Sequence, residues 1–169
     1  MEYTTRGAIL EDIPSITTIY NEGIEDKIAT LETRLRTKDE MRSWLIDRSD
    51  KHKVVVGEDK KGVILGWASL NQFNSRCCYS GVADISIYVK REMRGKGVGK
   101  GLLNFLTEVG KEQGFHKLVL SMIDSNISGK KLYLSSGFRE VGTYINQGII
   151  DGKWVNITIM EKLLVDAQE

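Results

Sequence analysis

One carboxylate, Asp84, lies inside the apolar run VADISIYV of residues 82–89. Side chains alternate along a strand, so Asp84 shares one face with Ser86 and Tyr88. Burying an acid is costly unless its face opens on a polar cleft, which makes Asp84 a candidate catalytic group, with general-base chemistry available to its carboxylate. A structural salt bridge or a turn cap is the alternative that the residues leave open.

A basic, glycine-rich loop follows directly, because residues 94–101 read RGKGVGKG. Glycines let backbone N–H groups converge on an anion, and the helix that follows points its positive end at the same place. A Walker phosphate loop is excluded by the spacing of its glycines, and a dinucleotide loop by their strict alternation. A pyrophosphate site remains, with Arg94, Lys96 and Lys100 adding charge, and a plain strand-to-helix turn is the alternative.

Outside these segments few residues suggest chemistry. Cys77 and Cys78 are adjacent, which makes a disulfide between them strained, and no histidine motif accompanies them as nucleophiles. We expect them to be loop or interface residues. His52 and His116 are the two histidines, and no metal-ligand spacing is present, so we expect no metal.

The composition indicates one globular domain spanning residues 1–169. The chain has 41% hydrophobic residues and a formal net charge of +1, which gives no global field for nucleic acid or for an acidic membrane. No apolar run reaches the roughly 18 residues of a membrane span, and residues 1–12 lack a secretory hydrophobic region. We therefore expect a cytoplasmic protein that binds neither nucleic acid nor a membrane.

The elements that position Asp84 and the loop follow from periodicity and turn signals. A helix is expected from Pro14, and a second after the capping-box pattern at 37–40. Strands are expected in 52–70, with a turn at 59–62, and in 82–89. The remaining expected elements are a helix ending at Gly114, a strand at 117–124, a short helix ending at Gly137, and two strands joined at Asp151-Gly152. This mixture predicts an α+β (mixed α/β) domain with a partly parallel sheet.

The loop and a later segment resemble the GNAT N-acetyltransferases. The family signature is Arg or Gln, two residues, Gly, one residue, then Gly or Ala, and residues 94–99 read RGKGVG. The segment NISGKKLYLSSGF at 126–138 resembles the second cofactor segment of the family. The resemblance implies the GNAT acyl-CoA N-acyltransferase fold, a mixed sheet of about six to seven strands flanked by about four helices. It also implies acetyl-CoA as the donor.

Several segments resemble one branch more narrowly, the phosphinothricin or methionine sulfoximine acetyltransferases. They are IYNEGIEDKIATLET, GWASLNQFNSR, DISIYV and DGKWVNITIM. That resemblance implies acetylation of the α-amino group of a small amino-acid-like acceptor by direct transfer, and a homodimer. Two other readings stay open, a protein N-terminal or lysine acetyltransferase and a non-catalytic acyl-CoA-binding module.

The resemblance also implies roles for individual residues. Tyr133 would serve as hydrogen-bond donor or general acid to the departing thiolate. Asp84 stands where this branch usually has glutamate, and the side chain shorter by one methylene favours proton transfer through a water. The residues implied to bind the cofactor are Ile87, Tyr88, Val89, Arg94, Gly95, Lys96, Gly97, Val98, Gly99, Lys100 and Asn126.

The acceptor pocket is expected to include Arg76, whose guanidinium can hold a substrate carboxylate by two hydrogen bonds. An exposed loop arginine without a ligand is the alternative. Phe73, Thr30 and Lys153 are expected to complete the pocket.

Overall fold

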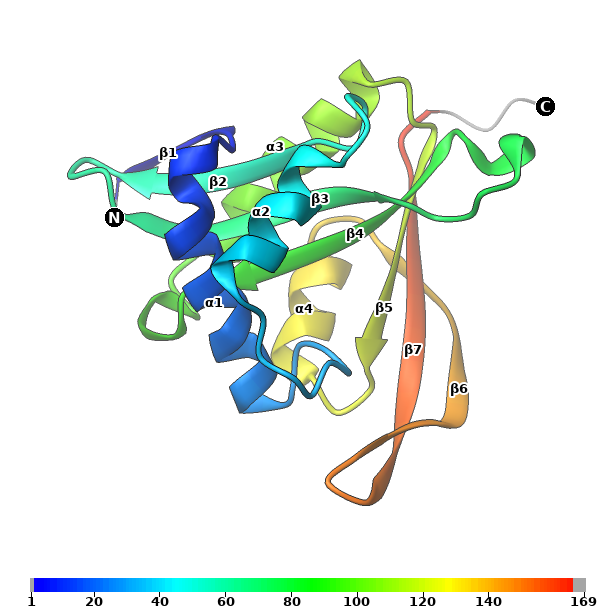
Figure 1. The fold of residues 1–169 in the computed structure, drawn as a ribbon. Helices are drawn as coiled ribbons and strands as arrows, with labels where there is room; N and C mark the ends of the chain where they lie inside the picture. Colours follow the sequence, from blue (N-terminus) through cyan, green and yellow to red (C-terminus); the bar gives the residue numbers. More distant parts are fainter. Residues whose placement is uncertain (1, 166–169) are drawn as a thin grey trace.

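The computed structural model describes residues 2–165, and its elements follow the expected order (Figure 1). The helices are α1 (Ile13–Asp26), α2 (Lys38–Ile46), α3 (Val98–Glu112) and α4 (Ile127–Ser135). The strands are β1 (Tyr3–Gly7), β2 (Val54–Asp59), β3 (Ile64–Gln72), β4 (Val82–Val89), β5 (Lys117–Ile123), β6 (Arg139–Ile150) and β7 (Lys153–Leu163). No helix within the described part of the chain is both long and apolar enough to cross a membrane.

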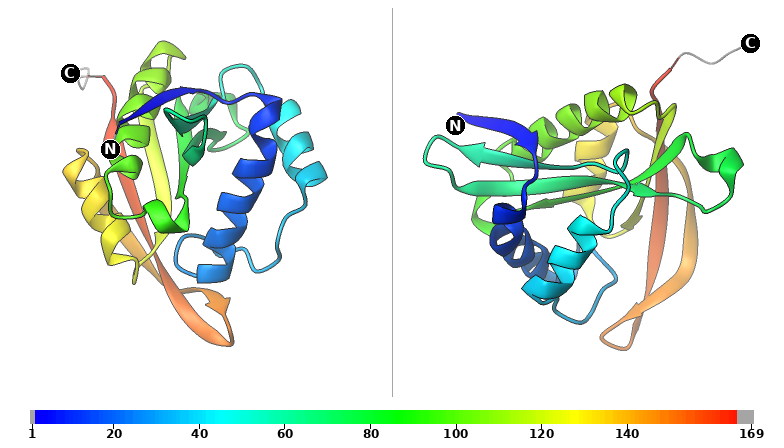
Figure 2. Two further views of the ribbon diagram at one scale, coloured as in Figure 1. Left: turned by 90° about the vertical axis from the view of Figure 1, so that its left-hand side faces the viewer. Right: turned by 45° about the horizontal axis from the view of Figure 1, so that its top comes forward.

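The seven described strands form one sheet in the order β1-β2-β3-β4-β5-β7-β6, in which β4 and β5 are parallel and the other neighbours antiparallel. Helices α1 and α2 lie on one face of the sheet, and α3 and α4 on the other (Figure 2). Each face has its own apolar core, because strand side chains alternate between the two. The predicted mixed, partly parallel sheet is confirmed.

Local signals in the sequence account for the ends of these elements. Thr37 caps α2, where its hydroxyl accepts from the Glu40 amide and the Glu40 carboxylate accepts from the Thr37 amide, as the capping box predicts. Gly114 has φ +83° just beyond α3 and Gly137 has φ +89° just beyond α4, a conformation that favours glycine. These two glycines end the helices and so determine where β5 and β6 begin.

The parallel pair β4–β5 is the shortest pairing in the sheet. Its register covers Val82↔Lys117, Ala83↔Leu118 and Asp84↔Val119 and then ends, although β4 continues to Val89. The two strands therefore separate after Asp84, and the edge of β4 that faces β5 is left without a backbone partner over its last residues. This separation positions the site.

Candidate active site

Asp84 lies at the point where β4 and β5 separate. It is the last residue of β4 that pairs with β5, and its side chain is half-buried. Burial raises the pKa of this carboxyl from 3.8 to about 6, and no ion pair to Asp84 is formed within residues 2–165. A buried carboxylate at such an opening can accept a proton near neutral pH. The salt-bridge alternative is therefore not what the structure shows.

A pocket of about 260 Å³ lies between the free edge of β4, the glycine loop and α4. Nine of the eleven residues predicted to bind the cofactor line it, together with Tyr133. The lining residues are Ile28, Ala29, Ile87, Tyr88, Val89, Arg94, Gly95, Gly97, Gly99, Lys100, Asn126, Ser128, Gly129, Leu132 and Tyr133. Sequence reasoning missed the contribution of Ile28 and Ala29, which follow α1 and reach this pocket through the tertiary fold.

The free edge of β4 presents backbone groups in alternation. The Lys90 amide donates to Leu65 O on β3, so alternate residues of β4 point their backbone toward β3. By that alternation Tyr88 bonds β3, whereas the N–H and C=O groups of Ile87 and Val89 face the pocket. An extended ligand can add to this edge as a further strand would.

The four alternating positions of the loop need glycine for two different reasons. Gly95 and Gly97 have φ +72° and +88°, and a Cβ at either position would meet nothing within 4 Å. A Cβ on Gly99 would lie 3.2 Å from Leu132 of α4, and one on Gly101 would overlap the hydroxyl of Tyr3. The backbone conformation of the loop therefore needs the first two glycines, and packing needs the other two.

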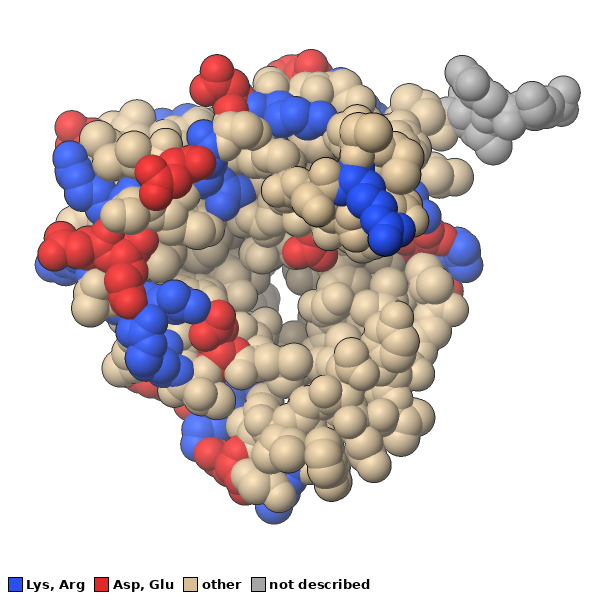
Figure 3. Space-filling view, turned by 45° about the vertical axis from the view of Figure 1, so that its right-hand side comes forward, with Lys and Arg blue, Asp and Glu red and all other residues tan. Residues whose placement is uncertain are grey.

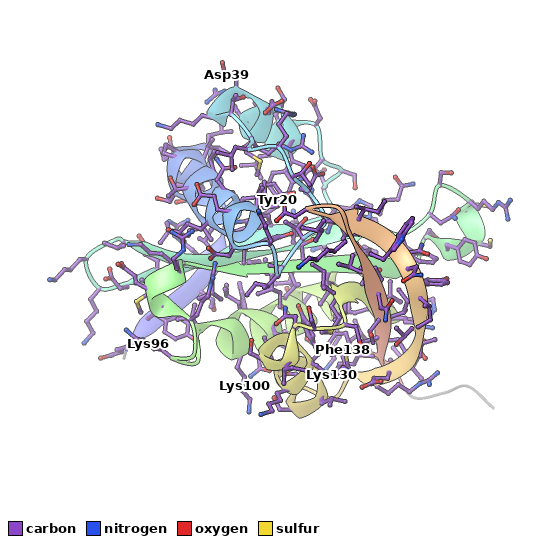
Figure 4. The ribbon with its side chains drawn as sticks, turned by 90° about the horizontal axis from the view of Figure 1, so that it is seen from below. Tyr20, Asp39, Lys96, Lys100, Lys130 and Phe138 are labelled. Atoms are coloured by element: carbon purple, nitrogen blue, oxygen red, sulfur yellow. The ribbon has the colours of Figure 1, made fainter. Side chains whose placement is uncertain are left out.

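The basic residues of the loop are not equivalent. Arg94 donates to Asp26 at the end of α1 and to Val89 O, at 3.3 Å, so its guanidinium also anchors β4. Lys100 lines the pocket, whereas Lys96 is exposed, does not line it and lies at the outer side of the loop (Figure 4). The Val98 side chain is 1% exposed and packs in the core, so only its backbone amide can serve a ligand.

Helix α4 brings two predicted residues to the opposite wall of this pocket. Asn126 caps α4, where its Oδ1 accepts from the Gly129 amide at 3.0 Å. Burial and the nearby charge of Asp84 raise the pKa of Tyr133 to about 12, so its hydroxyl stays protonated at neutral pH. The structure thus brings a candidate base and a candidate proton donor to the same opening.

The α1–α2 connection and the β6–β7 hairpin frame the other side of the opening. Lys27 forms an ion pair with Asp151 at the hairpin tip, and a Cβ on Gly148 would lie 3.3 Å from Leu31. Thr30 lies between these contacts, and its hydroxyl accepts from the Glu32 amide. The space-filling view shows this side of the molecule hollowed near its centre (Figure 3).

None of the four residues predicted for the acceptor pocket lines the 260 Å³ pocket or a second pocket under α2. Arg76 and Phe73 lie in the β3–β4 connection, where the Phe73 ring packs edge-on against Tyr79 at 5.5 Å. Arg76 is exposed and forms no ion pair within the described chain. Lys153 begins β7 and is exposed. Thr30 does not line either pocket, but its hydroxyl lies against those of Tyr20 and Tyr88.

A second pocket, of about 310 Å³, lies under α2 on the Asp84 face of the sheet. Alternate residues of β3 (Trp67, Ser69, Asn71) and of β4 (Ser86, Tyr88) form its floor. Sequence reasoning missed it, although polar residues at alternate positions of the buried strand ILGWASLNQ are a signal that could have indicated it.

Comparisons with known proteins agree with this geometry. The family model described as Acetyltransferase (GNAT) domain matches residues 6–159. The L-methionine sulfoximine/L-methionine sulfone acetyltransferase of Pseudomonas aeruginosa is 28% identical over 162 residues, which cover 95% of this chain and 94% of that protein.

Two solved structures have the same fold. The phosphinothricin acetyltransferase of Sinorhizobium meliloti, in complex with acetyl-CoA, is 30% identical with a TM-score of 0.89, covering 96% of this chain and 89% of that one. A ribosomal-protein-alanine N-acetyltransferase from Brucella melitensis is also 30% identical, with a TM-score of 0.91 and coverage of 95% and 99%. The chain belongs to the GNAT acetyltransferase family, and it is an acetyltransferase with the GNAT fold.

Proposed function

We propose that this enzyme transfers the acetyl group of acetyl-CoA to the α-amino group of a small amino-acid-like acceptor. The observation that carries the proposal is the position of Asp84 at the end of the β4–β5 pairing, with the glycine loop at the other end of the same free strand edge. The names of the similar proteins support this acceptor class, which includes phosphinothricin, methionine sulfoximine and methionine sulfone.

The residues present fit the cofactor. The first-turn amides of α3 and the loop at Gly95 and Gly97 suit a pyrophosphate, with Lys100 adding positive charge. The backbone groups of Ile87 and the Val89 N–H suit the amides of the pantetheine arm, and Asn126 lies opposite them. In this arrangement the Val89 N–H is available to polarise the thioester carbonyl.

Asp84 and Tyr133 carry the proton transfers in this proposal. With a pKa of about 6, Asp84 is mainly ionised at pH 7 and accepts a proton from the acceptor's ammonium group. The neutral amine then attacks the thioester directly, and the Tyr133 hydroxyl donates a hydrogen bond or a proton to the departing sulfur. No covalent acyl-enzyme is required.

The acceptor lies, in this proposal, between the α1–α2 connection and the β6–β7 hairpin. Thr30 and Lys153 come from these two segments, and Phe73 and Arg76 lie outside that space in the β3–β4 connection. The guanidinium of Arg76 has no ion-pair partner within residues 2–165, which leaves it available to a carboxylate. Holding the acceptor requires this connection to bring Arg76 toward the opening.

We also propose a homodimer that pairs through the β6–β7 hairpin. Exposed apolar side chains gather there, and Figure 3 shows a broad uncharged area on this side of the molecule. They are Val141, Tyr144, Ile145, Ile149 and Trp154, each between 52% and 69% exposed. The free thiols of Cys77 and Cys78 suit a reducing compartment, in keeping with a cytoplasmic enzyme.

A thiol-release assay tests the proposed function. The enzyme is mixed with acetyl-CoA and with methionine sulfone, phosphinothricin, ordinary amino acids, a polyamine or a short peptide. We expect release above background with the amino-acid analogues. Release with the peptide alone would favour a protein acetyltransferase, the activity named for the Brucella structure. Binding of acetyl-CoA without release for any amine would favour a non-catalytic module.

A further inference from the structure

Arg48 is a half-buried cation with no role in the proposed binding or acetyl transfer. It lies in the α2–β2 connection, and its guanidinium carbon sits 4.5 Å from the centre of the Trp44 ring. Burial lowers its pKa to about 10, and it forms no ion pair with any carboxylate in residues 2–165. Its donors go instead to Leu70 O, His52 O and, at 2.7 Å, Asn71 Oδ1.

The bond from Arg48 fixes the orientation of the Asn71 amide. Guanidinium is a donor without an acceptor, so the Asn71 atom facing it must be the oxygen. The Asn71 nitrogen therefore points the other way, and it donates to Ser86 Oγ at 3.2 Å. The second N–H of Asn71 has no acceptor within the described chain, and Ser86 Oγ keeps a second lone pair with which to accept a hydrogen bond.

Asn71 lies directly opposite Asp84. The two are partners in the β3–β4 register, and Ser86 lies on the same face two residues along β4. Side chains of directly opposed residues start from Cβ atoms about 5 Å apart. Asparagine and aspartate are both short, and no direct hydrogen bond joins this pair. The gap between them adjoins the 310 Å³ pocket that Asn71 and Ser86 line.

We propose that Asn71 and Ser86 hold the water through which Asp84 takes the acceptor's proton, with Arg48 as the positioning residue that orients Asn71. The Asn71 N–H can donate to the water, while Ser86 Oγ and the Asp84 carboxylate can accept from it, which gives the three partners that an ordered water typically has. One lone pair of the water stays free for the incoming proton. The acceptor's N–H bond breaks, the water receives that proton, and the water's own proton passes to a carboxylate oxygen of Asp84. Asn71 gains and loses no proton.

This inference rests on the proposed role of Asp84, and it accounts for how an aspartate can serve here. A glutamate at position 84 is longer by one methylene, so its carboxylate can reach the space of the water and take the proton directly. Asn71 then becomes dispensable. The effects of changing positions 71 and 84 should therefore be strongly non-additive.

The test is a double-mutant cycle with methionine sulfone as acceptor. We expect Asn71→Ala to lower kcat/KM by roughly tenfold or more in the Asp84 background, and by less than about twofold when Asp84→Glu is also present. Asn104→Ala, which removes an exposed asparagine from α3, is the matched control and should change neither background. Equal losses from Asn71→Ala in both backgrounds would overturn the inference.

The pH dependence gives a second readout that a merely structural role would not move. Tyr133 on α4 is the titratable group whose pKa responds to Asp84, while β3 presents the uncharged Asn71 and β5 the apolar Val119 at this position. Removing the Asn71 donors should raise the pKa of Asp84, which carbon-13 NMR of its carboxyl measures without any turnover. An unchanged titration in Asn71→Ala would overturn the water site.

The outcomes separate this inference from the function on which it rests. If the wild type acetylates the sulfone but the mutational effects are additive, the proposed function is supported and proton transfer through this water is refuted. If Asp84→Asn keeps full activity, Asp84 is not the base, and proton transfer to it through the water is refuted as well. If no amine releases thiol, the proposed function fails, and the NMR titration still decides whether Asn71 interacts with Asp84.

Discussion

Replacing Asp84 by asparagine should stabilise the fold while it removes the base. Folding raises the pKa of Asp84 from 3.8 to about 6, so the folded state holds this proton more tightly than the unfolded state does. Stability therefore falls as pH rises from about 4 to about 6, because the folded protein must then carry a buried carboxylate. Asparagine has nearly the same shape and no charge, so it avoids that cost.

The size of the effect follows from the shift. One pKa unit corresponds to 1.36 kcal/mol, so ionised Asp84 costs on the order of 2–3 kcal/mol of folding free energy above pH 7. Urea unfolding of the two proteins at pH 4 and pH 8 measures it. We expect Asp84→Asn to exceed the wild type by about that amount at pH 8 and to differ little at pH 4. Asp50→Asn, at an exposed acid after α2, is the control.

The same variant should be impaired in transfer. Its kcat/KM should fall by roughly 10²–10⁴ at neutral pH, with a smaller loss at high pH, where the acceptor amine is already neutral. A wild-type rate that declines only as pH falls through about 6 fits a carboxylate base, whereas the Asp84→Asn rate should already decline from higher pH in step with the neutral amine. A stability difference that is the same at pH 4 and pH 8 would refute the reasoning about burial.

Four further outcomes follow from the structure. Gly97→Asp should abolish acetyl-CoA binding in calorimetry, and Gly97→Ala should weaken it less. Both substitutions strain the backbone at φ +88°, but only aspartate adds negative charge, so equal losses of affinity would argue against a pyrophosphate there. Arg76→Ala should weaken the binding of acceptors that carry a carboxylate by about 1.5–3 kcal/mol, measured as a rise in KM, and leave KM for amines without one unchanged. An equal rise in KM for both kinds of amine would show that Arg76 does not bind the acceptor's carboxylate. Ile145→Glu should convert a dimer into a monomer in analytical ultracentrifugation, and an unchanged mass would place the interface elsewhere. Thr37→Ala should lower the free energy of unfolding by about 1 kcal/mol through loss of the α2 cap, which chemical denaturation measures, and no change would show that the cap adds nothing.

Features encoded within a few residues could be predicted from the sequence. The capping box at Thr37, the glycine stop after α3 and the Asp151-Gly152 hairpin act through neighbouring backbone, so pattern alone located them. The alternation in β4 also placed Asp84 correctly on its own strand face. The element order and the mixed sheet followed from these local signals.

Features that depend on tertiary contacts could not be predicted in the same way. The separation of β4 from β5 after Asp84 is a property of two strands joined through α3, and no local pattern specifies where it begins. The pairing of Arg94 with Asp26 likewise joins residues far apart in the chain, so a predicted phosphate ligand also proved to anchor β4.

The sequence also could not place Asn71 across from Asp84, because register depends on the intervening turn and on both strand faces. Residues that lie on different elements, such as Arg48 and Asn71, come together only through packing. For the same reason the position of Arg76 relative to the opening did not follow from its place in the chain.

Identification of the product tests the central claim most directly. The enzyme is incubated with acetyl-CoA and methionine sulfone, and the released CoA and the acceptor are quantified by mass spectrometry and NMR. We predict one N-acetyl methionine sulfone for each CoA released, with the acetyl group on the α-nitrogen, and strong loss of product in Asp84→Asn. Release of CoA without an acetylated acceptor, or an identical yield from Asp84→Asn at neutral pH, would contradict direct transfer to an amine with Asp84 as the base.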